Sequence, residues 1–574
     1  MNPKLAPAGF SDLVLYFLDT VRERGGHYQV AGLLVVIAVA YVLWRSGATR
    51  TVIQGVVSRF SRRTALVVLL TLCASFVLFS SPSAVTGRAM APMSSDEYGF
   101  LLIADTFRHG RLTNPPHPLW KHFENFYILQ QPTYTSKYWP AQAVAIASGW
   151  ITLGHPMHGV RLSGALACIA VFWMLCGWFN RPWALVGTLL AATSFVVFDW
   201  NQTYLGGNVA LLAGALCLGA LVRLMREPRS RDAVVFGLGM AILSNSRPFE
   251  GLVFSLCLGV SLLSWVITAG RQRFGLPVLA ARIAIPIALV MAADLAWIAF
   301  YSAAVTGDPF TVPYTLYIRR YEALPLFLFQ SPLSPSAPTC AMVAYNEAVI
   351  SQLRSYQTVL GLTIEDSRRL LTIAVTLISV GGLPFFVLGV RSFVRSGQIL
   401  LPFVITISTV IAFSVFPFEP YYFAHLVPAV LILTIAGIRS LPPGSFIGLV
   451  GLLLPAGQML AILLFVAKQG VVPSVGPNAR EGVEARLAPL EGRHLVVVKE
   501  ECSPANWGFV YNDADVDASK IVWAKDLGPK ANDALLAYYR DRTIWLLEIE
   551  RGEARIRPFT DGPIALPAAR DSRH

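Results

Sequence analysis

Charged residues are scarce in this chain. Only 14% of its 574 residues are Asp, Glu, Lys or Arg, whereas soluble domains carry about 25%. Together with 55% hydrophobic residues, this shortage excludes a soluble globular protein, a disordered chain and a coiled coil. The 37 prolines and 44 glycines follow no fixed period, which excludes collagen. The remaining class is a protein that crosses a membrane several times.

Cysteine is also infrequent, with seven residues. Five of them lie in apolar runs, where they behave as small hydrophobic side chains. Only Cys340 and Cys502 lie in polar segments, and these two could form a disulfide. The sequence contains no CxxC pair and no cluster of Cys and His. The N-terminus lacks a basic stretch before an apolar core and a cleavage site, so we expect no cleaved signal peptide.

Apolar runs long enough to cross a bilayer are abundant. A membrane-spanning helix needs about 20 apolar residues. On that criterion we predict about twelve spans, at 28–44, 64–81, 159–179, 183–199, 205–222, 233–247, 251–270, 278–302, 369–390, 398–416, 422–438 and 444–467. Segments 10–18 and 140–153 are too short to span, and we expect both at the membrane surface.

Arginine is concentrated in the loops of one face. The short loops assigned to that face carry sixteen arginines, no lysine and two acids, Glu227 and Asp232. Because Lys and Arg accumulate in short cytoplasmic loops, we assign this face to the cytoplasm. The net charge of +12 therefore reflects membrane topology, and we do not expect nucleic acid as a partner.

Three long polar segments, 82–158, 303–368 and 468–574, then fall on the external face. The last is expected to contain strands at 494–499, 520–527 and 543–550 and a helix at 531–542. The predicted fold class is an all-α polytopic membrane protein with a small C-terminal α/β soluble domain. We predict three parts: 1–63, with an interfacial segment, an extra span and a basic cytoplasmic loop; 64–467, a membrane module with external loops 82–158 and 303–368; and 468–574, an external α/β domain.

Ionisable residues gather on the external face. Asp96 and Glu97 stand at the start of an expected amphipathic helix, with Ser95 as its N-cap. This position suits first-turn acids that the helix dipole favours, but it also suits a carboxylate held at headgroup level beside a cavity between the spans. Asp199 ends the fourth predicted span, either within an interfacial aromatic anchor or as a second carboxylate that converges on Asp96.

Basic and aromatic residues accompany these acids. Arg247 lies between two spans near the external side, where it could pair with Glu250 or bind a phosphate through its bidentate fork. Segment 305–327 is either an amphipathic interfacial helix or a loop suited to sugar stacking and phosphate contact. Segment 417–429 contains His425 near a helix end, where a lone histidine is commonly structural.

Taken in their order along the chain, these residues and motifs resemble those of the GT-C superfamily of lipid-linked glycosyltransferases. The branch they resemble most is that of protein O-mannosyltransferases and aminoarabinose transferases. The resemblance covers about residues 64–440. It rests on the acidic pair after a span, KYWPAQAVAIASGWITLGHP (137–156), GVRLSGAL (159–166) with Arg161, the span ending in Asp199, SRPFEG (246–251) and VTGDPF (305–310). Span 28–44 precedes the usual module, and Lys137-Tyr138-Trp139-Pro140 replaces the K-P-P run that is common in the family.

The resemblance implies a function. The donor would be a sugar on a polyprenyl phosphate at the external face of the plasma membrane, and the acceptor a hydroxyl of an unknown glycan, lipid or protein. Asp96 would be the base of an inverting displacement, and Glu97 would position the acceptor or a metal. Phosphate is a good leaving group, so no general acid is required, but cations must hold it.

Further roles follow from the same resemblance. The implied contacts of the phosphate and lipid headgroup are Lys137, Arg247, Arg319 and His425, and those of the sugar or acceptor are Tyr98, Tyr314 and Tyr422. A divalent metal, Mg or Mn, stays open as a cofactor, with Glu97 and Asp199 as its candidate ligands.

Two other functions stay open. A transporter or flippase of a lipid-linked or small-molecule substrate also fits about twelve spans. Transporters usually place ionisable groups at mid-membrane, however, and Asp294 is nearly the only acid deep in a predicted span. A non-catalytic envelope assembly protein that kept the fold is the third possibility. The acids on the external face favour chemistry at the membrane surface.

Overall fold

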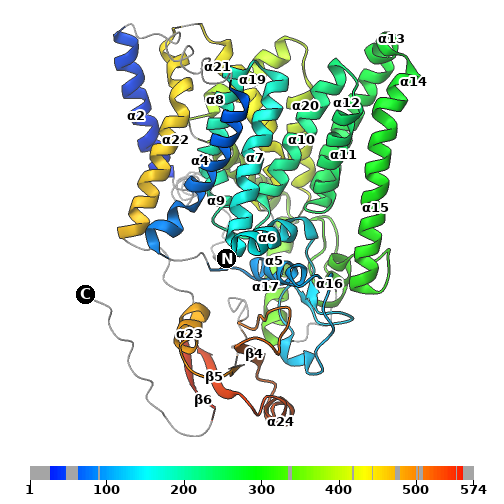
Figure 1. Cartoon of the computed structure of the whole chain (residues 1–574), viewed down its shortest axis with the longest axis vertical. Coiled ribbons are helices and arrows are strands. Elements are labelled where there is room, and N and C mark those ends of the chain that lie inside the picture. The colour runs from blue at the N-terminus through cyan, green and yellow to red at the C-terminus, as the bar shows by residue number, and fades with distance from the viewer. Residues whose placement is uncertain are drawn as a thin grey trace.

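A bundle of long helices forms one end of the molecule, and a small sheet forms the other (Figure 1). The structure is a computed structural model, and it describes residues 26–46, 63–87, 91–333, 339–379, 381–415, 419–442, 444–471, 479–499, 502, 509–550 and 553–559. The expected interfacial segment 10–18 and most of the basic loop 45–63 lie outside the described residues.

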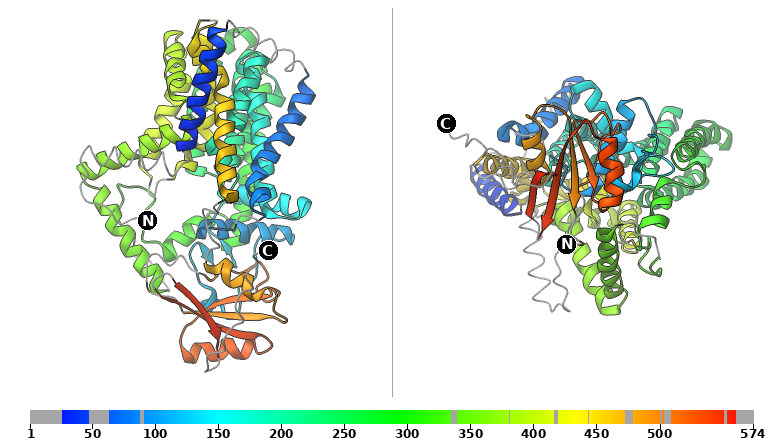
Figure 2. Two further views of the ribbon diagram at one scale, coloured as in Figure 1. Left: turned by 90° about the vertical axis from the view of Figure 1, so that its left-hand side faces the viewer. Right: turned by 90° about the horizontal axis from the view of Figure 1, so that it is seen from below.

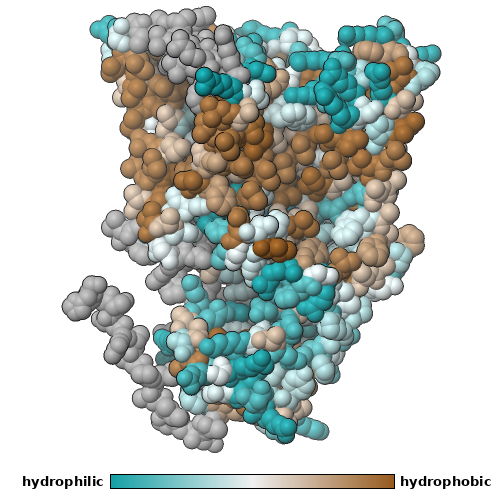
Figure 3. All heavy atoms as spheres, in the orientation of Figure 1, coloured by the Kyte–Doolittle hydropathy of each residue, from teal (hydrophilic) through white to brown (hydrophobic). Residues whose placement is uncertain are grey.

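Apolar residues cover the middle of the bundle on the face that Figure 3 shows. The long helices of the bundle are α2 (Gly26–Arg45), α4 (Thr64–Thr86), α7 (Pro156–Trp178), α10 (Gly207–Arg226), α12 (Pro248–Trp265), α15 (Ile285–Thr306), α21 (Val427–Ser440) and α22 (Phe446–Val471). The shorter ones are α8 (Arg181–Ala192), α9 (Phe195–Trp200), α11 (Ser230–Ser244), α13 (Arg271–Phe274), α14 (Leu276–Leu279), α19 (Leu383–Arg395) and α20 (Leu400–Ala412). The chain is therefore a multi-pass membrane protein.

Eleven of the twelve predicted spans coincide with helices of this bundle. In the described part of the chain, 8 helices are long and apolar enough to cross a membrane, each at a predicted span. The predicted spans 183–199, 233–247 and 398–416 correspond to shorter helices, namely α8 with α9, α11 and α20. The number of membrane crossings stays a prediction.

The expected straight span at 369–390 is instead a bent pair. Val359–Ile378 and Leu383–Arg395 meet at 94°. The bend follows Ser379, whose φ of 64° is in the left-handed region and ends the first helix. Pro384 lies in the first turn of α19, where its missing N–H costs no helical hydrogen bond.

A layer of shorter elements lies between the bundle and the sheet (Figures 1 and 2), and we call it the external layer after the face predicted for it. It contains the helices α5 (Ser95–Arg108), α6 (Pro140–Leu153), α16 (Pro313–Tyr321), α17 (Cys340–Tyr356) and α18 (Val359–Ile373), the 3₁₀ turn η1 (Trp120–Phe123) and the short strands β1 (Ile128–Leu129) and β2 (Thr135–Ser136). The helix expected at 140–153 is α6, with those bounds.

The C-terminal sheet has four strands in the order β4-β3-β5-β6. They are β3 (His494–Lys499), β4 (Ile521–Lys525), β5 (Thr543–Glu550) and β6 (Glu553–Pro558), accompanied by α23 (Ala479–Leu487) and α24 (Pro529–Tyr538). β3 pairs in parallel with β4 and β5, and β6 pairs antiparallel with β5. The three strands expected from sequence are confirmed, whereas β6 was not expected.

The sheet packs against the first external loop and shares a core with it. Leu102 and Phe123 of the external layer lie in one buried cluster with Val496 and Trp523 of the sheet. Hydrogen bonds cross the same boundary, for example from the backbone N–H of Ala514 to Asp105 at 2.9 Å. The bond considered between Cys340 and Cys502 is present and joins α17 to the C-terminal segment.

Candidate functional site

The first turn of α5 fixes the acidic pair. Ser94, and not the expected Ser95, is the N-cap, and Glu97 completes a capping box with it. One carboxylate oxygen of Glu97 accepts hydrogen bonds from the N–H groups of Met93 at 2.6 Å and Ser94 at 3.1 Å, and the other accepts from Tyr204 at 2.9 Å. Burial raises the pKa of Glu97 against the effect of these bonds. Glu97 therefore ties α5 to the loop before α10.

Asp96 lines a cavity of about 410 Å³ where the external layer meets the bundle. We call it the Asp96 cavity. Its walls come from the start of α5, the segment before α6, the turn between α11 and α12, α16, and the 3₁₀ helix η5 (Pro420–Leu426). Five of the predicted site residues line it: Asp96, Lys137, Arg247, Tyr314 and Tyr422. Further aromatic walls come from Phe100, Tyr127, Tyr138, Trp139, Tyr345 and Tyr421.

Tyr138 holds Asp96. Its phenol donates a hydrogen bond to Oδ1 of Asp96, and its ring stacks on Phe100 with centroids 4.5 Å apart. Gly99 permits this approach, because a Cβ there would lie 2.9 Å from the Tyr138 ring. Burial and the charge of Asp96 raise the pKa of Tyr138 well above its ordinary value, so the phenol remains a donor at neutral pH.

Lys137 is already paired. Its Nζ lies 2.7 Å from Oε1 of Glu322, and the two side chains are only 5% and 8% exposed. The ammonium also lies 3.9 Å from the ring centroid of Tyr127 and 4.8 Å from that of Tyr317. The charge of Lys137 is therefore balanced within the protein.

Arg247 is held by aromatic rings. It directly precedes α12, and its guanidinium carbon lies 4.4 Å and 4.5 Å from the ring centroids of Tyr421 and Tyr422. Among the described residues, no carboxylate comes within the 4.0 Å of an ion pair with Arg247, so the pair considered with Glu250 is not formed. Glu250 lines the same cavity and interacts with Arg247 electrostatically from beyond ion-pair distance. Stacking therefore fixes a guanidinium that has no carboxylate in direct contact among the described residues.

The other five predicted site residues do not line the Asp96 cavity. Glu97 caps α5, and Arg319 is exposed on α16. His425 is buried, with its ring 5.1 Å from that of Phe254. Tyr98 instead faces the C-terminal sheet and stacks on Tyr511 at 4.3 Å.

Asp199 does not converge on Asp96 as we considered. It lines a separate small cavity with Gln29, Thr376 and Ser379. The short helix α9 ends on the side of the bundle that faces α2, which turns this carboxylate away from α5.

Sequence reasoning missed two partners in the Asp96 cavity. Tyr138 stands next to Lys137 in the segment that replaces the K-P-P run, so its position within that segment could have drawn attention to it. Glu322 is 185 residues from Lys137, and no local pattern links the two.

The candidate metal ligands do not fit a metal beside Asp96. Both oxygens of Glu97 accept backbone N–H groups, and Asp199 lies in another cavity. Within the described ranges, no group of three or more His, Cys, Asp or Glu side chains is close enough to hold an ion. We derive no step through a metal.

Comparison with known proteins gives similarity in fold. No family model and no curated protein matches the chain. Among solved structures, ArnT from Cupriavidus metallidurans in the apo state aligns with a TM-score of 0.51 and 12% identity over 85% of this chain and 93% of that chain. The oligosaccharyltransferase of Archaeoglobus fulgidus, in complex with Zn and sulfate, aligns with a TM-score of 0.48 and 11% identity over 83% of this chain and 68% of that chain. The alignment with ArnT shows that this chain has a fold similar to that of ArnT, as the resemblance implied.

Proposed function

We propose that this protein transfers a sugar from a polyprenyl-phosphate donor to an acceptor hydroxyl at the external membrane face, with Asp96 as the base. One observation carries the proposal: Asp96 and Arg247 line the same aromatic cavity. Neither side chain forms an ion pair with another described residue. The GT-C fold and the position of this cavity at the end of the bundle support it.

Asp96 suits the proton that the acceptor loses, and Arg247 suits the negative charge of the leaving phosphate. As the acceptor oxygen attacks the anomeric carbon, its proton passes to the Asp96 carboxylate. The bond from that carbon to the phosphate oxygen breaks on the opposite face, which inverts the configuration. The leaving phosphate carries the electron pair and lies against the guanidinium of Arg247.

The pairing of Lys137 changes its role. Because Glu322 balances its charge, we assign the phosphate to Arg247 and give Lys137 the task of shaping the cavity wall. Tyr314 and Tyr422 line the cavity, and we assign the contact with the sugar to their aromatic side chains. We assign no chemical role to Asp199, Arg319, His425 or Tyr98, since these side chains do not line the cavity.

The disulfide supports an external site. Cys340 begins α17 in the layer that contains Asp96, and Cys502 belongs to the C-terminal segment that packs against this layer. Disulfides persist mainly in oxidising compartments outside the cytoplasm. The arginine-rich helix α13 lies at the opposite end of the bundle (Figure 1). This polarity agrees with a plasma-membrane protein whose C-terminal sheet is external.

The test is Asp96→Asn in purified protein reconstituted with a polyprenyl-phosphate sugar. Loss of a positioned base lowers a rate by about 10²–10⁴-fold, so we expect transfer to fall by that factor while the protein stays folded. Asp199→Asn, a matched change outside the cavity, should leave transfer unchanged. Undiminished transfer by Asp96→Asn would refute the base. Translocation of the lipid-linked sugar without any transfer by the wild type would instead support a flippase. Mass spectrometry of a deletion strain would identify the donor as the polyprenyl-phosphate sugar that accumulates.

A further inference from the structure

A second large cavity lies at the other end of the bundle. Its volume of about 1040 Å³ is close to the upper limit of about 1,000 Å³ for ligand pockets. α7 and α10 run from the external layer to this end, where their last residues meet the end of α12 and the turn between α19 and α20. None of the predicted site residues lines it. We call it the arginine cavity, after Arg226 and Arg439.

Arg226 and Arg439 are the charged side chains among the described residues of its wall. Arg226 ends α10 and Arg439 lies in the last turn of α21. In the described part of the chain, no acidic side chain lines the cavity and neither arginine forms an ion pair with a carboxylate. A basic residue at a helix C-terminus suits the helix dipole. The dipole does not explain why two such residues border one cavity without a counter-charge.

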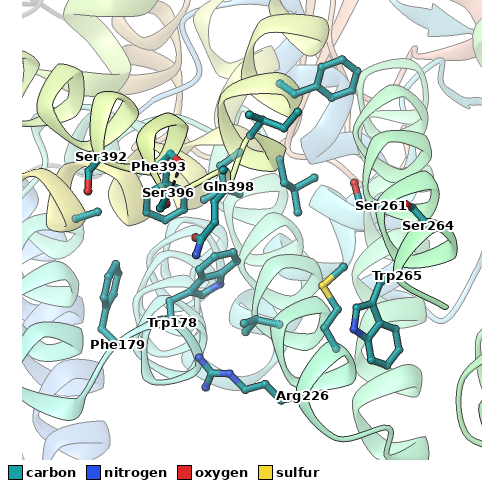
Figure 4. A pocket seen from close by; sticks show the side chains of 18 of the residues that line it. Trp178, Phe179, Arg226, Ser261, Ser264, Trp265, Ser392, Phe393, Ser396 and Gln398 are labelled. Carbon is teal, nitrogen blue, oxygen red and sulfur yellow. Dashed lines mark hydrogen bonds between the residues drawn. The ribbon is translucent and has the colours of Figure 1, made fainter. Parts of the chain in front are cut away.

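Polar and aromatic side chains surround the same space. Figure 4 shows Trp178 at the end of α7, Arg226 at the end of α10, Trp265 at the end of α12, and Ser396 and Gln398 in the turn between α19 and α20. The indole of Trp178 is anchored by a hydrogen bond from its Nε1 to the carbonyl of Leu218 at 3.2 Å. Tryptophan is typical of the headgroup level of a bilayer.

The cavity continues into an apolar surface. Val260, Ile399 and Phe403 all line it, yet they are 65%, 62% and 50% exposed. In a chain that crosses a membrane, such exposed apolar side chains face acyl chains. The arginine cavity therefore combines two cationic side chains at headgroup level with an apolar opening toward the bilayer. We call this opening, formed by Val260, Ile399 and Phe403, the apolar exit.

We infer that the arginine cavity binds an anionic phospholipid of the cytoplasmic leaflet. The phosphate lies between Arg226 and Arg439, and an acyl chain leaves past Val260 and Phe403. A basic pocket between helices on the cytoplasmic side matches this headgroup chemistry. A free phosphate or nucleotide would leave the apolar exit unused. The site is separate from the Asp96 cavity and does not depend on its proposed chemistry.

The experiment is native mass spectrometry of the full chain with phosphatidylglycerol or phosphatidylcholine of equal chain length. Each arginine near a membrane surface strengthens binding of an anionic lipid by about fivefold, so we expect the wild type to retain phosphatidylglycerol by about 25-fold over phosphatidylcholine. Arg226→Gln with Arg439→Gln should abolish this preference. Arg271→Gln with Arg273→Gln removes two charges from the same face outside the cavity and should preserve it.

A second variant separates a lipid from a free anion. Val260→Trp narrows the apolar exit but keeps both arginines, and we expect it to lower retention of phosphatidylglycerol severalfold. Equal retention of the two lipids by the wild type, which needs no variant to fold, would overturn the inference. So would undiminished retention after loss of both arginines, or displacement of phosphatidylglycerol by inorganic phosphate alone. Preferential retention of a polyprenyl phosphate over phosphatidylglycerol would overturn the assignment of the lipid class.

Discussion

Tyr138 donates a hydrogen bond from its phenol to Oδ1 of Asp96, across 42 residues of sequence. The contact joins α5 to the segment that enters α6, so the orientation of the proposed base depends on the packing of two external elements. A hydrogen bond to an ionised oxygen is about twice as strong as a neutral one. Tyr138 is thus a positioning residue for Asp96.

Tyr138→Phe should lower kcat of sugar transfer by about 10-fold or more. The variant keeps the ring stacked on Phe100 and removes only the donor, and a hydrogen bond to a charged group contributes about 1.5–3 kcal/mol. The measurement is steady-state transfer with varied donor, and KM should change less than kcat. Tyr134→Phe is the control, because that phenol donates to the carbonyl of Asn512 and does not line the Asp96 cavity. Equal effects of the two variants would contradict a positioning role.

Glu322→Gln should destabilise the protein strongly. It leaves the Lys137 ammonium buried without its counter-charge, and breaking a buried ion pair typically costs about 3–5 kcal/mol. The measurement is the midpoint of thermal unfolding in detergent. Glu548→Gln provides the comparison, since its partners Lys499 and Arg557 are exposed and such pairs contribute at most about 1 kcal/mol. A midpoint for Glu322→Gln as high as that of Glu548→Gln would count against the buried pair.

Local patterns predicted the elements better than their contacts. Hydropathy located all but one of the predicted spans on helices of the bundle, because the apolar requirement acts within about 20 consecutive residues. The capping box at Ser94 and Glu97 was also readable, since its S-x-x-E spacing is local. If Ser95 were the N-cap, Glu97 would not stand at the third helical position, so the expected cap did not predict the capping role of Glu97.

Local sequence patterns do not predict the contacts between distant segments. The partner of Lys137 depends on how α16 packs against the segment before α6, and the direction of Asp199 depends on the short helix α9. The arginine cavity is formed by the ends of several helices, none of which signals a site alone. The resemblance to GT-C proteins predicted the fold because it relied on the order of several motifs along the chain, which no single motif provides.

The disulfide gives a test of the external face. A membrane-impermeant maleimide applied to intact cells should label Cys340 and Cys502 only after reduction, because both thiols are then exposed to the outside. The double variant to Ser should remain unlabelled. Because the bond closes a loop between residues 162 apart, its loss should also lower stability by about 2–5 kcal/mol. Labelling of the wild type without reduction would contradict the bond, and labelling only in permeabilised cells would contradict the external face.

His117 joins the first external loop to the C-terminal sheet in a way that depends on pH. Its Nδ1 accepts the backbone N–H of Leu119 at 3.0 Å, and its Nε2 lies 3.3 Å from Oδ1 of Asp517. This geometry suits the neutral ring, which accepts at one nitrogen and donates at the other. Burial lowers the pKa of His117, and this effect outweighs the opposing charge of Asp517.

The unfolded state therefore binds a proton at His117 before the folded state does. As pH falls below about 6.5, where an unfolded histidine titrates, this residue should cost at most about 1.4 kcal/mol of stability per pH unit until the folded ring also titrates. His117→Gln retains an amide donor toward Asp517 but does not titrate, so its stability should fall less between pH 7 and pH 5.5. Thermal unfolding of both proteins at the two pH values measures the difference, and other histidines cancel in the comparison. Parallel losses in the two proteins would show that His117 does not control the pH dependence of this interface.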